Sequence, residues 1–255
     1  MTTTAIVVPC FDEEARLDLA ALTDLARLAG ARLVLVDDGS TDGTPALLAA
    51  AAAADPARIE VVTLAANRGK GEAVRAGLRA ALAGGDDVVG YYDVDLATPP
   101  EEMARLVDEL RDRPERLVVL GSRVGLLGHD IERSAARHYL GRLYATLASA
   151  ILRLSVYDTQ CGAKVLRAGP ALSAALATPF TSRWSFDVEL IGRLLRAGVP
   201  AAAFVEVPLR TWRDVGGSKL GPRSAVAAAL DLVRVARALR RQPAGPIGAS
   251  NSPTV

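Results

Sequence analysis

Residues 88–100 read Val-Val-Gly-Tyr-Tyr-Asp-Val-Asp-Leu-Ala-Thr-Pro-Pro, and the rest of the chain is organised around them. The stretch predicts a short apolar strand that ends in two carboxylates, Asp93 and Asp95. Because residues i and i+2 of an extended chain point to the same side, both carboxylates can turn toward one point. Oxygen ligands that converge in this way suit Mg²⁺ or Mn²⁺. A solvated acidic turn is the alternative, and the rest of the chain has to decide between the two.

The composition indicates a globular protein with an ordinary core. Half of the residues are hydrophobic and 23% are charged. The length of 255 residues is enough for one large domain or two small ones. The 30 basic and 29 acidic residues balance, which argues against a generally basic nucleic-acid binder. The spacing of Cys10 and Cys161 fits neither a disulfide framework nor a metal site, so we expect a reducing, cytoplasmic setting. The sequence predicts neither a signal peptide nor a membrane-spanning helix.

Strand and helix patterns alternate through the first half of the chain. Short apolar runs predict strands at residues 4–9, 32–36, 58–64, 88–93 and 116–121. Helical patterns lie between them, at residues 12–29, 44–54, 72–82 and 100–111. Asp12 and Thr44 are the expected N-caps of the first two helices. This order predicts an α/β domain whose mostly parallel, Rossmann-like sheet is flanked by helices.

Candidate binding residues follow each of the five predicted strands. They lie at residues 9–13, 37–38, 67–71, 93–95 and 121–123. In open α/β sheets, ligands bind beyond the carboxyl ends of the strands, so these segments should meet at one edge. Their convergence predicts a nucleotide-type site.

The pattern changes after residue 123. We expect a long helix at 134–154, a polar turn at 158–162 and a strand at 163–166. A helix that begins within 183–190 and runs to residue 196 should follow, then a strand at 202–208 and a polar loop at 210–220. An amphipathic helix is expected at 222–241, and a disordered tail at 242–255.

Several motifs together resemble those of inverting glycosyltransferases of family 2, which have the GT-A fold. They are Val-Pro-Cys-Phe-Asp-Glu-Glu (8–14), Val-Asp-Asp-Gly-Ser-Thr-Asp-Gly-Thr (36–44), Asn-Arg-Gly-Lys-Gly (67–71), Asp-Val-Asp (93–95) and Gly-Ser-Arg (121–123). The segments 158–164, 183–190 and 206–212 resemble those of the dolichyl-phosphate β-glucosyltransferase and polyprenyl-phosphate hexosyltransferase branch. The resemblance implies one domain at 1–221, with a nucleotide-sugar half (1–121) and an acceptor half (122–221).

The resemblance also implies the residues that bind the nucleotide. Those expected near it are Pro9, Phe11, Glu13, Asp37, Asp38, Arg68, Lys70, Asp93 and Lys219. Either Asp37 or Asp38 would accept a hydrogen bond from the base, and an Asx turn is the alternative for this pair. Asp93 and Asp95 would hold Mg²⁺ or Mn²⁺ on the diphosphate and stabilise the leaving group.

The acceptor determines which reaction is expected. A phosphate acceptor is already anionic and needs cations to hold it, for which Arg123, Arg133 and Arg137 are candidates. A solvated helix face is the alternative for the last two. Asp158 and Gln160 would shape the acceptor site. Asp187 would orient a cation or the sugar, or would act as the base for a hydroxyl acceptor; with Asp95 and Arg123 it completes the expected catalytic set.

We therefore expect transfer of a hexose, glucose from UDP-glucose, to a polyprenyl or dolichyl phosphate with a β-linked product. GDP-mannose as donor and a soluble hydroxyl acceptor are the alternatives within the family, and an inactive nucleotide-sugar-binding protein is the alternative outside enzymes. The helices at 134–154 and 222–241 could place the protein on the cytoplasmic face of a membrane, or could simply pack on the domain.

Overall fold

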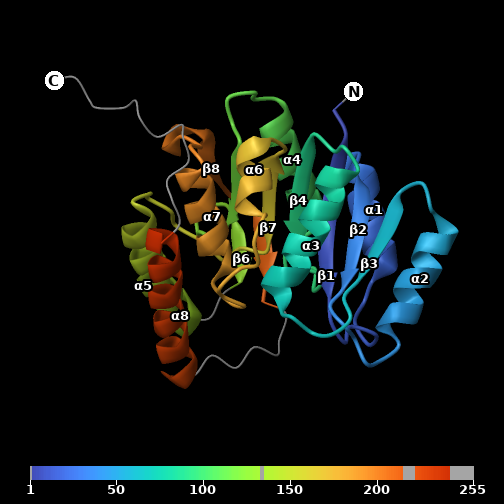
Figure 1. The fold of residues 1–255 in the computed structure, drawn as a ribbon, viewed down its shortest axis with the longest axis horizontal. Coiled ribbons are helices and arrows are strands. Elements are labelled where there is room, and N and C mark those ends of the chain that lie inside the picture. Colours follow the sequence, from blue (N-terminus) through green and yellow to red (C-terminus); the bar gives the residue numbers. More distant parts are fainter. Residues whose placement is uncertain (1, 133–134, 215–221, 242–255) are drawn as a thin grey trace.

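A seven-stranded sheet forms the centre of the structure, a computed structural model that describes residues 2–132, 135–214 and 222–241 (Figure 1). The strand order is β3-β2-β1-β4-β7-β5-β8, and within this sheet β7 alone runs antiparallel to its neighbours. The sheet consists of β1 (Thr4–Cys10), β2 (Arg32–Asp37), β3 (Ile59–Thr63), β4 (Val88–Tyr92), β5 (Val118–Ser122), β7 (Ala163–Arg167) and β8 (Phe204–Pro208). The predicted mostly parallel sheet is confirmed.

Helices cover both faces of the sheet. On one face lie α1 (Leu19–Ala29), α2 (Thr44–Ala54) and α4 (Pro100–Arg111), whose buried leucines share one apolar cluster with side chains of the sheet. On the other face lie α3 (Lys70–Ala83), α6 (Pro170–Ala175) and α7 (Phe186–Arg196). Each central strand therefore has apolar side chains on both sides, which explains its continuous apolar sequence.

Two further helices extend the second layer at the β8 end of the sheet (Figure 1). These are α5 (Ala135–Leu152) and α8 (Pro222–Arg241). Buried residues of both helices join the core around α7, among them Ala148 on α5 and Val235 on α8. Both helices thus pack on the domain, and each also has a face that is exposed to solvent.

The structure corrects several local predictions. The first helix is capped by Asp18, whose side chain accepts a hydrogen bond from Ala21 N, and not by Asp12, which adopts φ +50° in the preceding loop. Thr44 is the first residue of α2, and Gly43 is its N-cap. The last strand of the sheet begins at Phe204 after a 3₁₀ turn, η1 (Ala201–Ala203).

Residues 122–214 contain elements that the sequence did not predict. Residues 210–220 were expected to be a polar loop, but β9 (Thr211–Arg213) pairs in parallel with β6 (Asp130–Glu132). The short helix α6 was also missed. The expected tail at 242–255 lies outside the described residues, and the division of the domain at residue 121 stays a prediction.

Candidate active site

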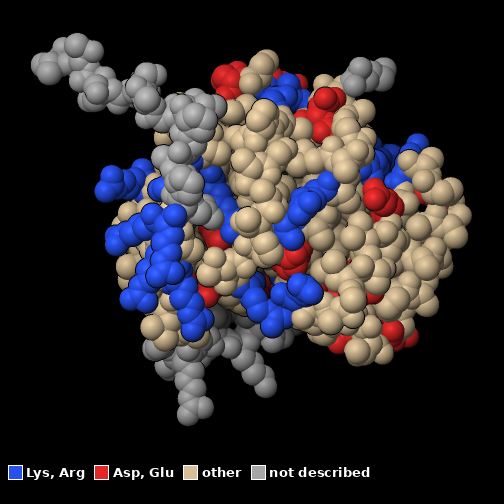
Figure 2. Space-filling view, viewed as in Figure 1, with Lys and Arg blue, Asp and Glu red and all other residues tan. Residues whose placement is uncertain are grey.

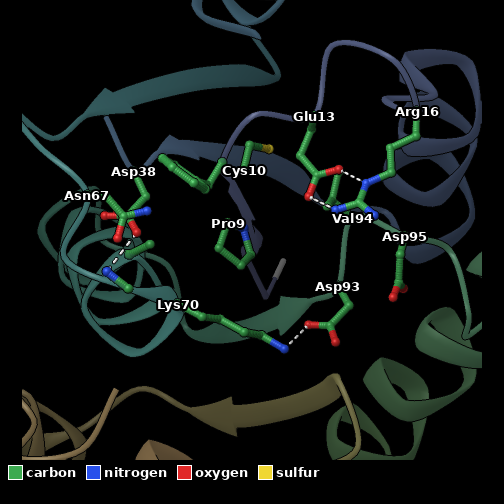
Figure 3. Close-up of a pocket in the computed structure, with 13 residues that line it drawn as sticks. Pro9, Cys10, Glu13, Arg16, Asp38, Asn67, Lys70, Asp93, Val94 and Asp95 are labelled. Atoms are coloured by element: carbon green, nitrogen blue, oxygen red, sulfur yellow. Dashed lines mark hydrogen bonds and ion pairs between the residues drawn. The ribbon is translucent and has the colours of Figure 1, made fainter. Parts of the chain in front are cut away.

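A cavity of ≈ 340 Å³ opens at the carboxyl ends of β1 and β4 (Figure 3). It is lined by Pro9, Cys10, Phe11, Glu13, Arg16, Asp38, Asn67, Gly69, Lys70, Ala73, Asp93, Val94 and Asp95. Seven of the residues predicted from the sequence therefore meet in one place. The parallel order of β1 to β4 brings them together, because each lies near the carboxyl end of a strand or in the segment that follows it.

Asp93 and Asp95 follow β4 at the floor of the cavity. The backbone N–H of Asp93 donates to Gly162 O at 2.9 Å, which extends the pairing of β4 with β7 by one residue. Gly162 has no Cβ, and a Cβ there would overlap the Asp93 carboxylate. Burial and the charge of Asp93 raise the pKa of Asp95 above its usual value. A bound cation would oppose that shift, so the pair suits one.

The donor set fits a hard divalent cation held partly by substrate. Among the described residues there is no group of three or more His, Cys, Asp or Glu side chains arranged for a metal ion. Asp93 and Asp95 supply only carboxylate oxygens, the ligand type that Mg²⁺ and Mn²⁺ prefer. The two residues could hold such an ion, which would offer its other positions to diphosphate oxygens and water.

Lys70 begins α3 and extends across the cavity toward the acidic pair. Its Nζ lies 2.5 Å from Asp93 Oδ1, and its side chain is 42% exposed. Loss of hydration lowers the pKa of Lys70. The charges of Asp93, Asp187 and Asp95 raise this pKa by more than burial lowers it, so the net shift is upward. Lys70 is therefore a cation at neutral pH and is placed to meet an anionic ligand.

The opposite wall carries a second ion pair. Arg16 donates through Nη2 to Glu13 Oε1 at 2.8 Å and through Nε to Glu13 Oε2 (Figure 3). Glu13 is 6% exposed, and its backbone N–H donates to Thr44 Oγ1. The Arg16 side chain is 57% exposed, so this guanidinium is open to a ligand in the cavity.

Asp37 and Asp38 have different environments. Asp38 lines the cavity, and its two oxygens accept hydrogen bonds from the backbone N–H groups of Arg68 and Gly69, both at 2.8 Å. The carboxylate thus holds the loop before α3 in place. Asp37 does not line the cavity and accepts from Ser40 N at 2.9 Å. That bond is the local turn that the sequence left open as an alternative.

Arg123 and Asp158 meet after the ends of β5 and α5. Arg123 donates to both Asp158 oxygens, at 2.7 and 2.9 Å, and its guanidinium lies 5.3 Å from the centre of the Trp212 ring. Burial lowers the pKa of Arg123 less than the Asp158 carboxylate raises it. Both residues border a small recess together with Gln160. The predicted phosphate-binding arginine is therefore already paired with the predicted acceptor-site aspartate.

A glutamate on β8 holds this segment in place. Glu206 accepts hydrogen bonds from the backbone N–H groups of Tyr157 at 2.6 Å and Asp158 at 2.7 Å. Glu206 had no predicted role, because the contact joins residues about fifty positions apart. Through these two hydrogen bonds, β8 holds the turn that precedes β7.

Asp187 lies behind the cavity, in the first turn of α7. Its Oδ1 accepts from Lys164 Nζ at 2.7 Å and from the hydroxyl of Tyr91. Tyr91 and Lys164 are partners across β4 and β7, and both are fully or almost fully buried. Lys164 had no predicted role, and neither did Arg16.

Three predicted residues are not placed by the structure. Arg133 and Lys219 lie outside the described residues, and so does the side chain of Arg137. Their roles stay predictions.

Comparison with known proteins identifies the family. The model of the family described as "Glycosyl transferase family 2" matches residues 5–171. The chain belongs to this family. Dolichyl-phosphate beta-glucosyltransferase of Dictyostelium discoideum is 29% identical over 247 residues, covering 91% of the chain and 73% of the relative. Polyprenol monophosphomannose synthase of Mycolicibacterium smegmatis is 28% identical, covering 85% of the chain and 80% of the relative.

A solved structure confirms the GT-A fold of this family 2 member. Glucosyl-3-phosphoglycerate synthase from Mycobacterium tuberculosis, in complex with Mn²⁺, UDP and its product, has a TM-score of 0.67 at 20% identity over 93% of the chain and 80% of that structure. The similarity to several curated dolichyl-phosphate beta-glucosyltransferases shows that the protein is a hexosyltransferase. No helix in the described part of the chain is long and apolar enough to span a membrane.

Proposed function

We propose that this hexosyltransferase moves glucose from UDP-glucose to a polyprenyl or dolichyl phosphate, with inversion, and gives a β-linked lipid-phosphate sugar. The observation that carries the proposal is the shared cavity of Asp93, Asp95, Lys70 and Arg16, in which Lys70 pairs with Asp93 and Arg16 pairs with Glu13. Curated relatives named dolichyl-phosphate beta-glucosyltransferase support glucose as the sugar and a dolichyl phosphate as the acceptor.

The donor diphosphate fits between these groups. Asp93 and Asp95 would hold Mg²⁺ or Mn²⁺ against the diphosphate, and the ion would stabilise the charge of the departing nucleoside diphosphate. Lys70 and Arg16 would contact diphosphate oxygens directly. The nucleoside would lie against Pro9 and Phe11, with Asp38 or Asp37 near the base, and Arg68 and Lys219 toward the nucleotide.

The acceptor half supports an anionic acceptor. A phosphate monoester needs no general base, because it is already ionised at neutral pH. Arg123 would orient it, with Arg133 and Arg137 as further cations, while Asp158 and Gln160 shape the recess. In this scheme the acceptor phosphate replaces Asp158 as the partner of part of the Arg123 guanidinium.

Exposed faces of α5 and α8 support a peripheral position on a membrane surface, which we propose to be the cytoplasmic face. Tyr139, Leu140, Leu143 and Leu147 form an exposed apolar stripe on α5. On α8, exposed arginines at 234, 237, 240 and 241 accompany Leu230 and Val233, and Figure 2 shows basic side chains gathered over this helix. An apolar stripe beside a basic face suits an anionic interface.

One relative favours a second donor. Polyprenol monophosphomannose synthase covers the chain almost as fully as the glucosyltransferases do, so GDP-mannose is the alternative to UDP-glucose. Calorimetric titration with UDP and with GDP in the presence of Mn²⁺ distinguishes the two donors. We expect UDP to bind at least about tenfold more tightly, and tighter binding of GDP would replace UDP-glucose in the proposal.

A further inference from the structure

Lys164 is a lysine ammonium with almost no access to solvent. Its side chain is 1% exposed, and its Nζ donates to Asp187 Oδ1 at 2.7 Å and to Cys161 O at 2.5 Å. A charge buried in this way is costly unless it is paired. The Asp187 carboxylate, 7% exposed, is the paired countercharge.

The surroundings of Asp187 are fixed from several sides. Its titratable and charged neighbours come from four elements: Tyr91 on β4, Lys164 on β7, Lys70 on α3 and Tyr144 on α5. Burial and the charge of Asp187 raise the pKa of Tyr91 well above its usual value, so its hydroxyl stays protonated and donates to Asp187. Two of the four neighbours are lysines, and two of them, Tyr91 and Lys164, donate hydrogen bonds to Asp187 Oδ1.

We propose that Lys164 is a positioning residue, which holds the Asp187 carboxylate in place so that Asp187 serves as a countercharge at the site and not as a base toward the acceptor. A base must take up a proton as the acceptor reacts. With Oδ1 bonded to an ammonium and to a hydroxyl, Asp187 would have to gain that proton beside a buried cation. Its negative charge instead faces Lys70, which pairs with Asp93 in the cavity.

The part of this proposal that concerns the acceptor rests on the proposed function. The pairing of Lys164 with Asp187 does not, because it concerns two buried side chains of the chain itself. We therefore choose one set of variants with readouts of both kinds. The variants are Lys164→Met, Asp187→Asn and the double variant, with Arg193→Met as the control. Arg193 is also a buried cation, paired with Glu189 on the same helix, α7, but it does not line the cavity.

The first readout is thermal unfolding near neutral pH, which needs no turnover. Lys164→Met leaves the buried Asp187 carboxylate without its cation, and Asp187→Asn leaves the buried Lys164 ammonium without its anion, so each single variant should unfold at a lower temperature than the wild type. The double variant removes both charges and should lose less stability than the sum of the two single losses. Additive losses would overturn the pairing.

The second readout is turnover with a polyprenyl phosphate, resolved into kcat and KM, with UDP affinity measured beside it. Lys164→Met should lower kcat while UDP affinity stays at the wild-type level, because the Asp187 carboxylate is no longer held in place, whereas Arg193→Met should keep the wild-type kcat. Asp187→Asn should lower kcat less than about tenfold, since loss of a general base typically costs about 10²–10⁴-fold. A loss of about 10²-fold or more with UDP binding intact would make Asp187 the base and overturn the proposal. If the wild type transfers no sugar, the proposed function fails, while the unfolding measurements still decide the pairing.

Discussion

The Nζ of Lys70 lies 2.5 Å from Asp93 Oδ1, so an ammonium group contacts a carboxylate that we propose as a metal ligand. Two cations cannot share one side of a carboxylate without repulsion. A divalent ion that binds Asp93 therefore has to displace Lys70, and a donor diphosphate offers Lys70 a new anionic partner. The pair suggests that nucleotide and metal bind together.

Replacing Lys70 tests this relationship. Lys70→Met should raise the affinity for Mn²⁺ in the absence of nucleotide, because the competing ammonium is gone. The same change should lower UDP affinity by about tenfold or more, since a charge-assisted hydrogen bond to the diphosphate is lost. Calorimetry with Mn²⁺ alone and with UDP measures both. Arg68→Met is the control, because it removes an exposed cation from the same loop, and it should not increase Mn²⁺ affinity. Equal increases in both variants would show that the effect comes from the change in net charge and not from the contact of Lys70 with Asp93.

The acidic pair has the most direct consequence for activity. Asp95→Ala should lower turnover at least about 100-fold, because a ligand of the proposed metal is lost. Folding should be little affected, since the hydrogen bond recorded for its side chain is one from Ala97 N. Sugar transfer and thermal unfolding are measured side by side. Full activity in the variant would show that Asp95 is not a required metal ligand.

Gly162 lies against Asp93 in a space that only a glycine leaves open. Gly162→Ala should displace the carboxylate and weaken Mn²⁺-dependent UDP binding, at a stability cost of about 1–3 kcal/mol from overpacking. Gly125→Ala is the matched control, because a Cβ at that position meets nothing within 4 Å. Unchanged UDP binding in Gly162→Ala would show that Asp93 can move without loss.

Both cysteines should be unreactive in the folded protein near neutral pH. Burial, followed by the charges of Glu13 and Asp37, raises the pKa of Cys10 to about 12, and burial raises that of Cys161 to about 11. A thiol below its pKa is protonated and is a poor nucleophile. Iodoacetamide at pH 8 should therefore label the native protein far more slowly than the unfolded protein. Equal rates would show that the cysteines are ionised or exposed in the folded state.

The apolar stripe on α5 is expected to contact lipid. The combined change Leu143→Glu and Leu147→Glu should reduce co-sedimentation with vesicles of anionic phospholipid by about tenfold or more, because two exposed leucines become charged. Leu28→Glu, on α1 at the other end of the molecule, should leave binding unchanged (Figure 1). Vesicle binding that is equal in all three proteins would contradict a role for α5 at the membrane.

The cavity could be predicted from the sequence because its residues follow parallel strands. Asp38, Lys70 and Asp93 each come within a few positions of a predicted strand end, and parallel pairing alone brings such positions to one edge. Arg16 was missed because it lies in the loop between β1 and α1, where no periodicity indicates a direction.

The buried network behind the cavity could not be predicted. Tyr91 and Lys164 become neighbours only through the register of β4 and β7, and β7 is the antiparallel strand of the sheet. Asp187 reaches them because α7 begins at Phe186, three residues into the predicted segment. Likewise β6 and β9 have three residues each, too few for an alternating pattern.

The central claim is sugar transfer to a lipid phosphate, and the most direct measurement follows radiolabel from UDP-glucose into the organic phase. The reaction contains Mg²⁺ or Mn²⁺ and a short-chain polyprenyl phosphate, with the corresponding polyprenol as the control acceptor. We predict that label enters the lipid with the phosphate acceptor and the divalent ion, and not with the polyprenol. Label from UDP-glucose that stays in the aqueous phase, while UDP still binds, would contradict the account.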